Sequence, residues 1–422
     1  MTGRGFTMAD GGKIETLRIG MIGSGFIAKL HLQALVGVRN VVVSGVYSPT
    51  SAHREAFARM ANDMDLGPCT AFDSIAAMVT SGSVDALWIL APNFTRLAVM
   101  EEIHALQTSG RARLAGIACE KPLARTVREA REMLRLAEDA GLSHGYLENQ
   151  VFSTAVQRGK EIIWRRAVPS SGRPYLARAA EEHSGPHEPW FWQGSQQGGG
   201  VLLDMMCPCY EVARFLLTEP GAARGTLTPV TANATVSSLK WTRPEYAAKL
   251  RTMMGPQVDY TRSPAEDFAR ATVMLRGPDG REVMVEATTS WAYVGAGMRI
   301  QLELLGPEYA MEFSSLNTPL KIFLSRAVAG GQGEDLVEKQ NAEQGLMPVL
   351  EDEAGIYGMT AENRHMVEAF RRGTRPTETF EDGVAVMEVL MALYRSAEIG
   401  QVVKLPAPEL ETYIPPVARA GG

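Results

Sequence analysis

The sequence contains little of what stabilises small secreted proteins or builds membrane spans. Only four of its 422 residues are cysteine, so we expect no disulfide framework and a reducing, cytoplasmic setting. Cys207 and Cys209 have no second pair at zinc-ligand spacing, so no metal site is expected. No apolar run approaches the length of a membrane span, and a formal charge of −6 argues against nucleic-acid or anionic-membrane partners.

A glycine-rich turn near the start of the chain organises the rest of the sequence. Residues 19–28 read I-G-M-I-G-S-G-F-I-A, in which an apolar strand stops at Gly23 and Gly25 and a helix begins. Backbone N–H groups of the helix start, Phe26 and Ile27 included, and the positive end of the helix dipole are left for a pyrophosphate. A plain tight turn would use the same glycines, but the setting in a βαβ series favours dinucleotide binding.

Strand and helix patterns alternate from Leu17 to about Leu147. Val41–Tyr47, for example, is a β-branched run of the kind found in buried parallel strands. Such a series predicts a doubly wound parallel sheet that binds ligands at the carboxyl ends of its strands. The cofactor-contacting candidates at those ends are Ser48, Pro92, Asn93, Glu120 and Lys121.

The end of the second strand bears on the choice of cofactor. An acid is expected there in an NAD enzyme, about twenty residues beyond the glycines, but none is present. Ser48, Thr50 and Arg54 can donate to a 2′-phosphate. Alternatively, Ser48 and Thr50 cap the next helix, with Pro49 at its start. NAD and NADP both stay open, with NAD slightly favoured.

Lys121 stands at the end of a predicted parallel strand, before Pro122. Three interpretations compete: a solvated lysine, a pyrophosphate contact, or a catalytic acid–base with a shifted pKa. The strand-end position beside a cofactor favours the last, because a crowded ammonium loses its proton more easily.

A second candidate stretch runs from Gly198 to Glu211. Its three glycines would let the backbone pass close to a ligand. Asp204 would share a helical face with Pro208 and Glu211 if the helix is already wound at Asp204, and Pro208 would then be tolerated near the first turn. The alternative for Asp204 is a helix N-cap.

The stretch from His183 to Trp192 combines two histidines and three aromatic residues with breaks at glycine and proline. Apolar ring faces beside hydrogen-bonding groups suit carbohydrates, although the same residues can anchor a loop. The substrate-binding candidates are Lys121, His183, Trp190, Trp192, Asp204 and Tyr210, and His183 and His187 are also catalytic candidates.

The second half of the chain changes character after a helical stretch at Phe152–Arg165. Strand-like runs then succeed one another without helices, and Gly277–Gly280 is typical of a hairpin turn. Helices return at Ala361–Arg372 and Glu381–Ile399. Long loops are expected at Arg243–Thr261 and Ala327–Tyr357.

These motifs resemble the glucose–fructose oxidoreductase/inositol dehydrogenase/MocA family over roughly Leu17–Leu405. The resemblance implies NAD(P)-dependent hydride transfer to or from a secondary hydroxyl of a sugar, inositol or related polyol, and an open sheet that is often the oligomer interface. Lys121 matches the family's catalytic lysine, and Asp204 matches an aspartate that orients substrate or tunes that lysine. The residues that carry the resemblance are G-S-G-F-I-A with His31, Ala91-Pro92-Asn93, Cys119-Glu120-Lys121-Pro122-Leu123, and the glycine run with Asp204.

Two positions depart from the family pattern. Pro208 and Arg96 stand where the family often has histidines, and proline cannot move a proton. Three interpretations remain: Lys121 acts alone, a histidine of the aromatic stretch substitutes, or the chain has become a non-catalytic sugar sensor. A redox-assisted glycosidase with tightly held NAD is a further catalytic alternative. The substitutes considered are His183, His187 and, more weakly, Tyr210 and Glu211.

The predicted fold is α/β: an N-terminal Rossmann domain with a doubly wound parallel sheet, then a C-terminal α+β domain with a large open, mainly antiparallel sheet. We expect a homo-oligomer formed through that sheet. The expected ranges are a disordered lead-in without a signal peptide at 1–16, the Rossmann domain at 17–148, a substrate and oligomerisation domain at 149–405, whose last helices are candidates for packing on the first domain, and a C-terminal tail at 406–422.

Overall fold

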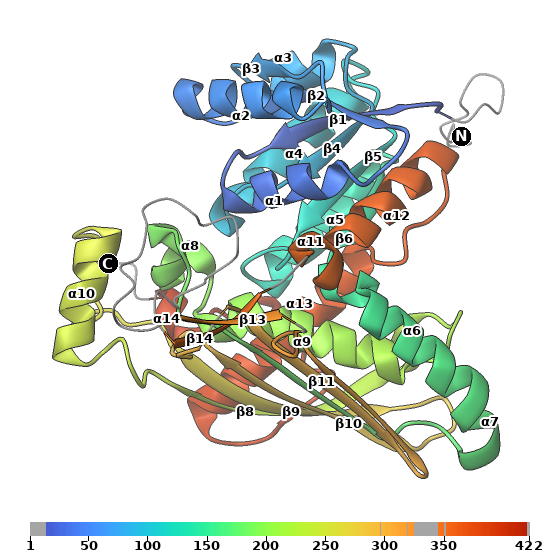
Figure 1. Ribbon diagram of the computed structural model, residues 1–422, viewed down its shortest axis with the longest axis vertical. Coiled ribbons are helices and arrows are strands. Elements are labelled where there is room, and N and C mark those ends of the chain that lie inside the picture. Colours follow the sequence, from blue (N-terminus) through green and yellow to red (C-terminus); the bar gives the residue numbers. More distant parts are fainter. Residues whose placement is uncertain (1–13, 296, 319, 325–344, 350–351, 420–422) are drawn as a thin grey trace. The chain divides into compact units, whose positions relative to one another are not determined.

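The computed structural model describes residues 14–295, 297–318, 320–324, 345–349 and 352–419 (Figure 1). Most of the expected lead-in, and much of the loop expected at 327–357, therefore lie outside the described residues. The chain forms two compact units. The first comprises the described residues up to Ala124, Arg128–Phe152 and Gly358–Ala385, and the second comprises Arg125–Val127, the described residues of Ser153–Tyr357, and the described residues from Val386 onward.

The first unit is built on a six-stranded sheet whose neighbouring strands are all parallel. Its strand order is β3-β2-β1-β4-β5-β6, the order of doubly wound nucleotide-binding folds, which confirms the predicted Rossmann architecture. The central strands are apolar along their length because helices cover both faces. The strands are β1 (Leu17–Ile22), β2 (Val41–Tyr47), β3 (Thr70–Phe72), β4 (Ala86–Ile89), β5 (Gly116–Glu120) and β6 (Ser143–Leu147).

A helix from late in the chain, α12 (Met359–Arg372), completes the first unit beside α1 (Phe26–Leu35) (Figure 1). It packs tightly on β5 and β6, where a Cβ at Gly116 would lie 2.7 Å from the Phe370 ring and one at Gly145 would lie 2.5 Å from Met366 Sδ. The other helices are α2 (Ser51–Asp63), α3 (Ile75–Thr80), α4 (Arg96–Thr108) and α5 (Val127–Asp139), with the short turns η2 (Asn93–Thr95) and η3 (Asn149–Phe152).

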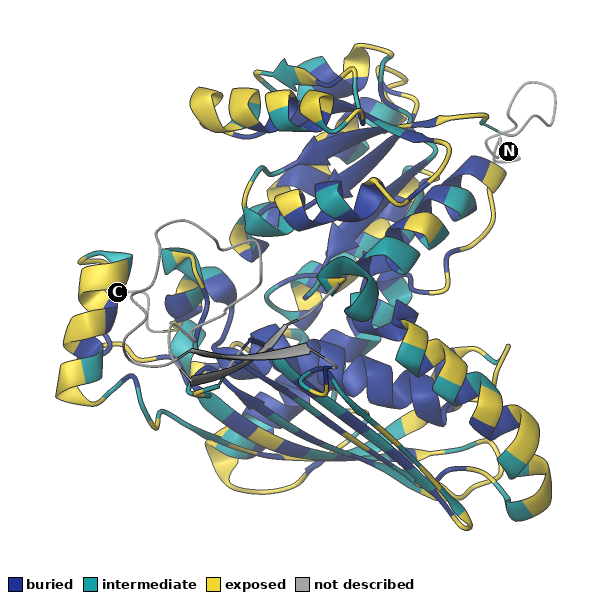
Figure 2. Ribbon diagram, in the orientation of Figure 1, coloured by how far each residue is buried: buried dark blue, intermediate teal, exposed yellow. Residues whose placement is uncertain are grey.

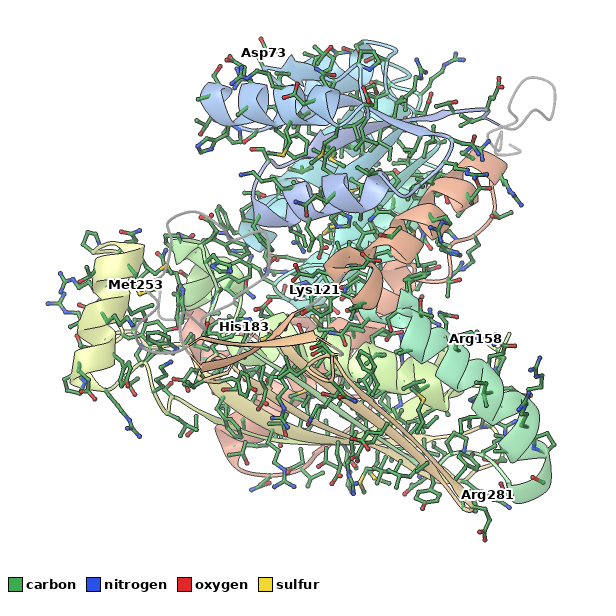
Figure 3. The ribbon with its side chains drawn as sticks, in the orientation of Figure 1. Asp73, Lys121, Arg158, His183, Met253 and Arg281 are labelled. Atoms are coloured by element: carbon green, nitrogen blue, oxygen red, sulfur yellow. The ribbon has the colours of Figure 1, made fainter. Side chains whose placement is uncertain are left out.

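The second unit is built on a seven-stranded sheet of order β12-β11-β7-β10-β9-β8-β15. Only the β7–β10 pair among these strands is parallel, so the sheet is mainly antiparallel, as predicted. The tip of the predicted hairpin carries Arg281 (Figure 3). The strands are β7 (Leu176–Glu182), β8 (Thr228–Ser237), β9 (Phe268–Arg276), β10 (Glu282–Ser290), β11 (Arg299–Gly306), β12 (Tyr309–Ser314) and β15 (Val403–Lys404).

One helix, α9 (Val201–Leu217), is buried along its whole length against this sheet (Figure 2). It contacts β7, β9, β10 and β11. Its apolar residues lie all round the helix rather than along one stripe, which is the pattern of an interior helix. No helix among the described residues is both long enough and apolar enough to cross a membrane.

One further region differs from the sequence expectation, and another contains helical turns that were not predicted. The segment expected to be a loop at Arg243–Thr261 contains α10 (Pro244–Met254), which starts with proline at its first position and ends at Gly255. The expected tail at 406–422 contains η7 (Pro408–Glu411) and α14 (Pro416–Arg419), and α14 packs on α8. The remaining elements are α6 (Thr154–Ile162), the π-helical turn η4 (Ile163–Ala167), α7 (Val168–Ser171), η5 (Pro189–Trp192), α8 (Gly194–Gln197), η6 (Arg224–Thr226), β13 (Leu320–Leu324), β14 (Gly345–Val349), α11 (Glu353–Ile356) and α13 (Phe380–Ile399).

Candidate functional site

The glycine turn between β1 and α1 leaves an open surface at the start of the helix. Gly23 has φ +114°, and a Cβ there would lie 2.7 Å from the carbonyl oxygen of Leu90, so this position requires glycine. Gly25 is the N-cap of α1 and uses no side chain for capping, and no described atom lies within 4 Å of a Cβ built on it. These features fit a pyrophosphate bound at the helix N-terminus beside Phe26 and Ile27.

The end of β2 carries a cation but no acid. Ser48 is buried, and Arg54 donates from Nη1 to the carbonyls of Ser48 (3.2 Å) and Pro49 (3.3 Å). The helix α2 starts at Ser51 with Thr50 as its N-cap. Thr50 thus occupies the N-cap position that the alternative interpretation gave it, whereas Pro49 precedes the cap instead of starting the helix. The Thr50 side chain makes no capping bond among the described residues.

Arg96 links the ends of β4 and β5. It is buried at the start of α4, and its Nε donates to the carbonyl of Ala91 (2.9 Å), which precedes Pro92 and the buried Asn93. The remaining guanidinium contacts go to three consecutive carbonyls: Nη1 donates to Glu120 (2.5 Å) and to Pro122, and Nη2 contacts Lys121 (3.5 Å). Sequence reasoning noted Arg96 only as a missing histidine.

Lys121 comes directly after β5 and is half-buried (Figure 3). The side chain of the preceding residue, Glu120, is buried, and each of its two carboxyl oxygens contacts a neighbouring group. Its Oε2 accepts the backbone N–H of Lys121 (2.8 Å), and its Oε1 lies 3.0 Å from His31 Nε2. The residue predicted to be catalytic therefore sits at a strand end whose backbone is fixed by Arg96 and Glu120.

Asp204, in the second unit, lies in the first turn of α9 and is buried. The N-cap of this helix is Gly200, so the N-cap alternative for Asp204 is wrong. Its Oδ2 accepts the indole N–H of Trp291 at 3.2 Å. This bond fixes one carboxylate oxygen from a residue just after β10.

The glycine run before α9 accommodates side chains of the protein itself. A Cβ at Gly199 would lie 2.1 Å from Tyr394 Oη, and one at Gly200 would lie 2.7 Å from the Glu266 carboxyl group. Glu266 accepts the N–H groups of Gly200 (2.9 Å) and Leu202 (3.1 Å), and Tyr394 donates to it at 2.5 Å. Burial raises the pKa of Glu266. The structure thus explains these glycines by the capping of α9, where the sequence suggested approach to a ligand.

Pro208 is the eighth residue of α9 rather than part of its first turn, which corrects the expectation. Proline has no N–H to donate to the carbonyl of Asp204, four residues earlier, and the thiol of Cys207 donates to that oxygen at 3.1 Å instead. Glu211 is buried between Arg214 (2.6 Å) and Arg224 (2.7 Å). That charge pairing gives Glu211 a structural role.

The aromatic stretch divides into a buried part and an accessible part. Trp192 is only 2% exposed, and its ring packs on those of Trp241, Tyr260 and Trp291 at centroid distances of 5.2–5.4 Å. Trp192 therefore supports the residue that holds Asp204, and its burial argues against substrate contact. Trp190 is half-buried and stacks on its neighbour Phe191 at 3.8 Å.

The three remaining candidates differ in access. His183 is 1% exposed, and its Nδ1 accepts the N–H of Gly185 (2.9 Å), whereas His187 is exposed. Tyr210 is fully buried, and burial raises its pKa. Burial of this degree argues against substrate contact for Tyr210.

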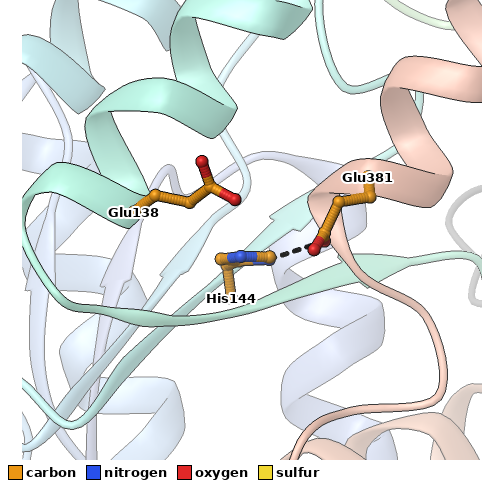
Figure 4. A group of neighbouring side chains, drawn as sticks. All are labelled: Glu138, His144 and Glu381. Atoms are coloured by element: carbon orange, nitrogen blue, oxygen red, sulfur yellow. Dashed lines mark ion pairs between the residues drawn. The ribbon is translucent and has the colours of Figure 1, made fainter.

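A cluster of Glu138, His144 and Glu381 lies at the opposite, amino end of β6 (Figure 4). His144 Nδ1 is 3.6 Å from Glu381 Oε2 and accepts the N–H of Phe380 at 3.2 Å. Burial lowers the pKa of His144. These contacts fasten the start of α13 to the sheet, and nothing in them indicates a ligand.

The candidate residues thus form two sets, each within one unit. The first unit brings the glycine turn, Ser48, Asn93, Glu120 and Lys121 to the carboxyl ends of neighbouring strands. The second joins Asp204 to the aromatic stretch through Trp291. Sequence reasoning missed the supporting residues Trp291, Glu266 and Tyr394, and it missed the supporting role of Arg96.

Comparison with known proteins identifies both units. Residues 17–146 match the profile described as "Oxidoreductase family, NAD-binding Rossmann fold" (GFO_IDH_MocA), and residues 169–310 match the "GFO/IDH/MocA C-terminal domain". Levoglucosan dehydrogenase of Pseudarthrobacter phenanthrenivorans is 26% identical over 91% of this chain and 97% of its own length. 1,5-Anhydro-D-fructose reductase of Ensifer adhaerens is 29% identical, but the match spans only 49% of this chain and 58% of that protein.

Solved structures share the fold. The structure of GenD2 from gentamicin A biosynthesis, in complex with NAD, has a TM-score of 0.73 at 21% identity, and the match covers 96% of this chain and all of GenD2. A levoglucosan dehydrogenase complex with NADH and levoglucosan has a TM-score of 0.67 at 19% identity, and the match covers 93% of this chain and 99% of that protein. The chain therefore belongs to the Gfo/Idh/MocA family of NAD(P)-dependent oxidoreductases.

Proposed function

We propose that this protein transfers a hydride between a nicotinamide dinucleotide and a secondary hydroxyl of a sugar, inositol or related polyol or glycoside. The observation that carries the proposal is the open, uncapped start of α1 in the same unit as a lysine at the end of β5. The sugar class is supported by relatives named levoglucosan dehydrogenase and D-glucoside 3-dehydrogenase.

The residues that hold the dinucleotide in this proposal lie at the strand ends of the first unit. The bound nicotinamide supplies the hydride acceptor for oxidation, or the donor for reduction. The proposed contacts are Gly23, Gly25, Phe26 and Ile27 with the pyrophosphate, Ser48 with the adenosine ribose, and Pro92, Asn93, Glu120 and Lys121 toward the nicotinamide.

Lys121 is the proposed acid–base. In oxidation its unprotonated amine takes the proton of the substrate hydroxyl as the carbonyl forms, and in reduction its ammonium returns that proton. Arg96 and Glu120 hold the backbone on either side, so the side chain of Lys121 starts from a fixed backbone position. Such positioning is what makes a single acid–base group effective.

Asp204 is the proposed residue that orients the substrate hydroxyl, with Trp291 holding its carboxylate. In the aromatic stretch, Trp190 offers a ring face to sugar C–H groups and His187 an exposed imidazole in place of the family histidine lost at Pro208. His183 is the buried alternative.

The proposal is tested by incubating the protein with sugars, inositols and glycosides, with NAD⁺ or NADP⁺, and following absorbance of the reduced nicotinamide. Lys121→Ala should lower kcat by about 10²-fold or more while dinucleotide still binds. An unchanged kcat in this variant would remove Lys121 from the mechanism. Asp204→Asn should lower kcat/KM for the substrate.

A matched glycine pair tests the dinucleotide site separately. Gly25→Ala adds a methyl group where no described atom lies within 4 Å, so it should leave the melting temperature unchanged and weaken dinucleotide binding. Gly110→Ala meets no described atom either but requires a positive φ, so any effect it has should fall on stability alone. Unaltered dinucleotide affinity in Gly25→Ala would contradict the assigned site.

Pro208 favours one second candidate, a non-catalytic sugar sensor. A proline inside α9 replaces the proton-carrying histidine expected from the family. Binding of both dinucleotide and sugar without turnover, across the whole panel, would support the sensor. Release of an aglycone without net formation of reduced cofactor would instead indicate the glycosidase alternative.

We also propose a cytoplasmic homo-oligomer that associates through the face of the large sheet opposite α9. All four cysteines are buried thiols, which suits a reducing compartment. On that sheet, Arg178 pairs with Glu286 (2.7 Å) and Glu303 (3.1 Å) on the flanking strands. Light scattering should give a multiple of the chain mass, and Arg178→Glu should lower it.

A further inference from the structure

A buried hydrogen-bond network connects α12 to the end of β5. Asn363, His31 and Trp88 are all fully buried, although Asn363 comes 332 positions after His31 in the sequence. Trp88 Nε1 donates to Asn363 Oδ1 (3.0 Å), and Asn363 Nδ2 lies 2.9 Å from His31 Nδ1 and 2.8 Å from the carbonyl of Met359.

These contacts determine the orientation of the Asn363 amide. An indole N–H can only donate, so the atom of Asn363 that faces Trp88 must be the oxygen. The amide nitrogen then donates one hydrogen to the Met359 carbonyl and the other to His31. The indole N–H of Trp88 and the carbonyl of Met359 have roles that cannot be exchanged, so these two partners fix the orientation of the amide.

The amide in turn selects the tautomer of His31. His31 Nδ1 lies nearer to Asn363 Nδ2 (2.9 Å) than to Oδ1 (3.2 Å), and Oδ1 already accepts from Trp88, so Nδ1 is assigned as the acceptor that carries no proton. The proton of the neutral ring is therefore on Nε2, which lies 3.0 Å from Glu120 Oε1. The other oxygen of Glu120 already accepts the N–H of Lys121. Donation therefore runs from Trp88 through Asn363 and His31 to Glu120, which also accepts the backbone N–H of Lys121.

We propose that Asn363 is a positioning residue for the end of β5, where Glu120 and Lys121 lie. Asn363 holds His31 as the Nε2–H tautomer, and His31 thereby fixes the carboxyl group of Glu120 beside Lys121. The tautomer is determined by contacts within the first unit alone. Its effect on turnover rests on the proposed dehydrogenase function.

A second buried carboxyl group, that of Glu362, adjoins this network. Glu362 adjoins Asn363 on α12, is fully buried, and has no hydrogen-bond partner for either carboxyl oxygen among the described residues. Burial, with the charges of Glu120 and Glu148, raises the pKa of Glu362 well above its usual value. Glu362 therefore resists ionisation, and the carboxyl group that His31 contacts is that of Glu120. Arg96 adds a cation at the Glu120 carbonyl.

The tautomer is tested by ¹⁵N NMR of imidazole-labelled protein, in which His31→Gln identifies the His31 signals by their loss from the seven histidines. Wild-type protein should show a protonated Nε2 and an unprotonated Nδ1. Asn363→Asp replaces the amide donor by an acceptor, so Nδ1 should gain a proton and both ring nitrogens should shift to imidazolium values. A wild-type Nδ1–H tautomer, or unchanged His31 shifts in Asn363→Asp, would overturn the proposal.

A second comparison separates donation from packing. His31→Leu fills the buried space without a donor, whereas the amide of His31→Gln can accept from Asn363 and donate to Glu120. We expect kcat to fall about tenfold or more in His31→Leu and Asn363→Leu, with KM less affected, and His31→Gln to restore most of it. His104→Gln, at a half-buried histidine paired with Asp139, is the matched control.

The two experiments can refute the proposed function and the positioning role of Asn363 separately. If His31 has the expected tautomer but no substrate is turned over, the proposed function fails and the network stands. If the protein is an active dehydrogenase and His31→Leu matches His31→Gln in kcat, the positioning role is overturned.

Discussion

The guanidinium of Arg96 donates to the carbonyl of Glu120 across 2.5 Å, from the first residue of α4 to the last residue of β5. The same group reaches the carbonyls of Lys121 and Pro122. A planar cation with five N–H donors suits this task, because backbone oxygens at several angles can be satisfied at once. Arg96 therefore fastens the segment that presents the proposed acid–base.

We expect Arg96→Met to lower the free energy of unfolding by about 2–4 kcal/mol, because it leaves buried carbonyls without donors. Arg96→Lys should recover part of this loss, since an ammonium reaches fewer of the carbonyls. Denaturant unfolding gives the stability, and kcat with KM gives the effect on Lys121. A kcat that survives in Arg96→Met would show that the fastening is structural only.

Much of the first unit could be predicted from the sequence because its signals are local. The glycine turn, the apolar strands and the strand-end lysine occur within short stretches, and their order determines the parallel sheet. The strand β7 has no such local signal, because Leu176–Glu182 is rich in alanine and glutamate, which have low strand propensity, although it lies inside the large sheet. The sheet neighbours override that local preference.

The supporting residues of the candidate site could not be predicted for a different physical reason. Arg96 reaches carbonyls 24–26 residues away, Trp291 reaches Asp204 over 87 positions, and Asn363 reaches His31 over 332. No periodicity or motif in one sequence encodes such pairs, because each depends on the tertiary fold. Pro208 was misplaced because the start of α9 is set by a cap from Glu266, 66 residues beyond Gly200.

The cap on α9 predicts a sharp difference between two glycines of the second unit. Gly200→Ala places a methyl group 2.6 Å from the Glu266 carbonyl oxygen, so we expect a loss of about 2–4 kcal/mol in unfolding free energy and displacement of Asp204. Gly225→Ala is the control, since no described atom lies within 4 Å of its Cβ. Thermal and denaturant unfolding measure both, and equal stability of the two variants would contradict the packing role of Gly200.

The buried carboxyl group of Glu362 predicts a pH-dependent gain of stability. Its pKa in the folded protein is raised well above 4.5, the ordinary value that applies in the unfolded chain. Between the unfolded and the folded pKa, the folded state binds more protons than the unfolded state, so the free energy of unfolding falls as pH rises. Glu362→Gln removes this penalty and should raise the unfolding free energy by about 1 kcal/mol or more at pH 8. The gain should shrink as pH approaches 4.5.

A second glutamate on the same helix, Glu368, serves as the control, because its replacement should change stability in the opposite direction. Burial opposes the ionisation of Glu368, but the hydrogen bond from Arg371 prevails and lowers its pKa. Glu368→Gln should therefore lose stability at neutral pH, and the loss should vanish as pH falls below 4.5. Melting temperatures of both variants from pH 4 to 8 test the pair, and parallel curves would contradict the assignment of charge.

The contacts of Arg54 at the end of β2 predict how removal of its charge changes the affinity for NAD(H) and for NADP(H). Arg54 lies against the carbonyls of Ser48 and Pro49, where the 2′ position of an adenosine ribose is expected in this fold. A guanidinium stabilises a 2′-phosphate through charge-assisted hydrogen bonds, which a 2′-hydroxyl gains far less from. Arg54→Gln should therefore weaken NADP(H) binding about tenfold and leave NAD(H) binding nearly unchanged. Arg59→Gln, at an exposed position of the same helix, should alter neither. Calorimetric titration of both dinucleotides measures the ratio, and an equal change for the two would show that Arg54 does not face the ribose.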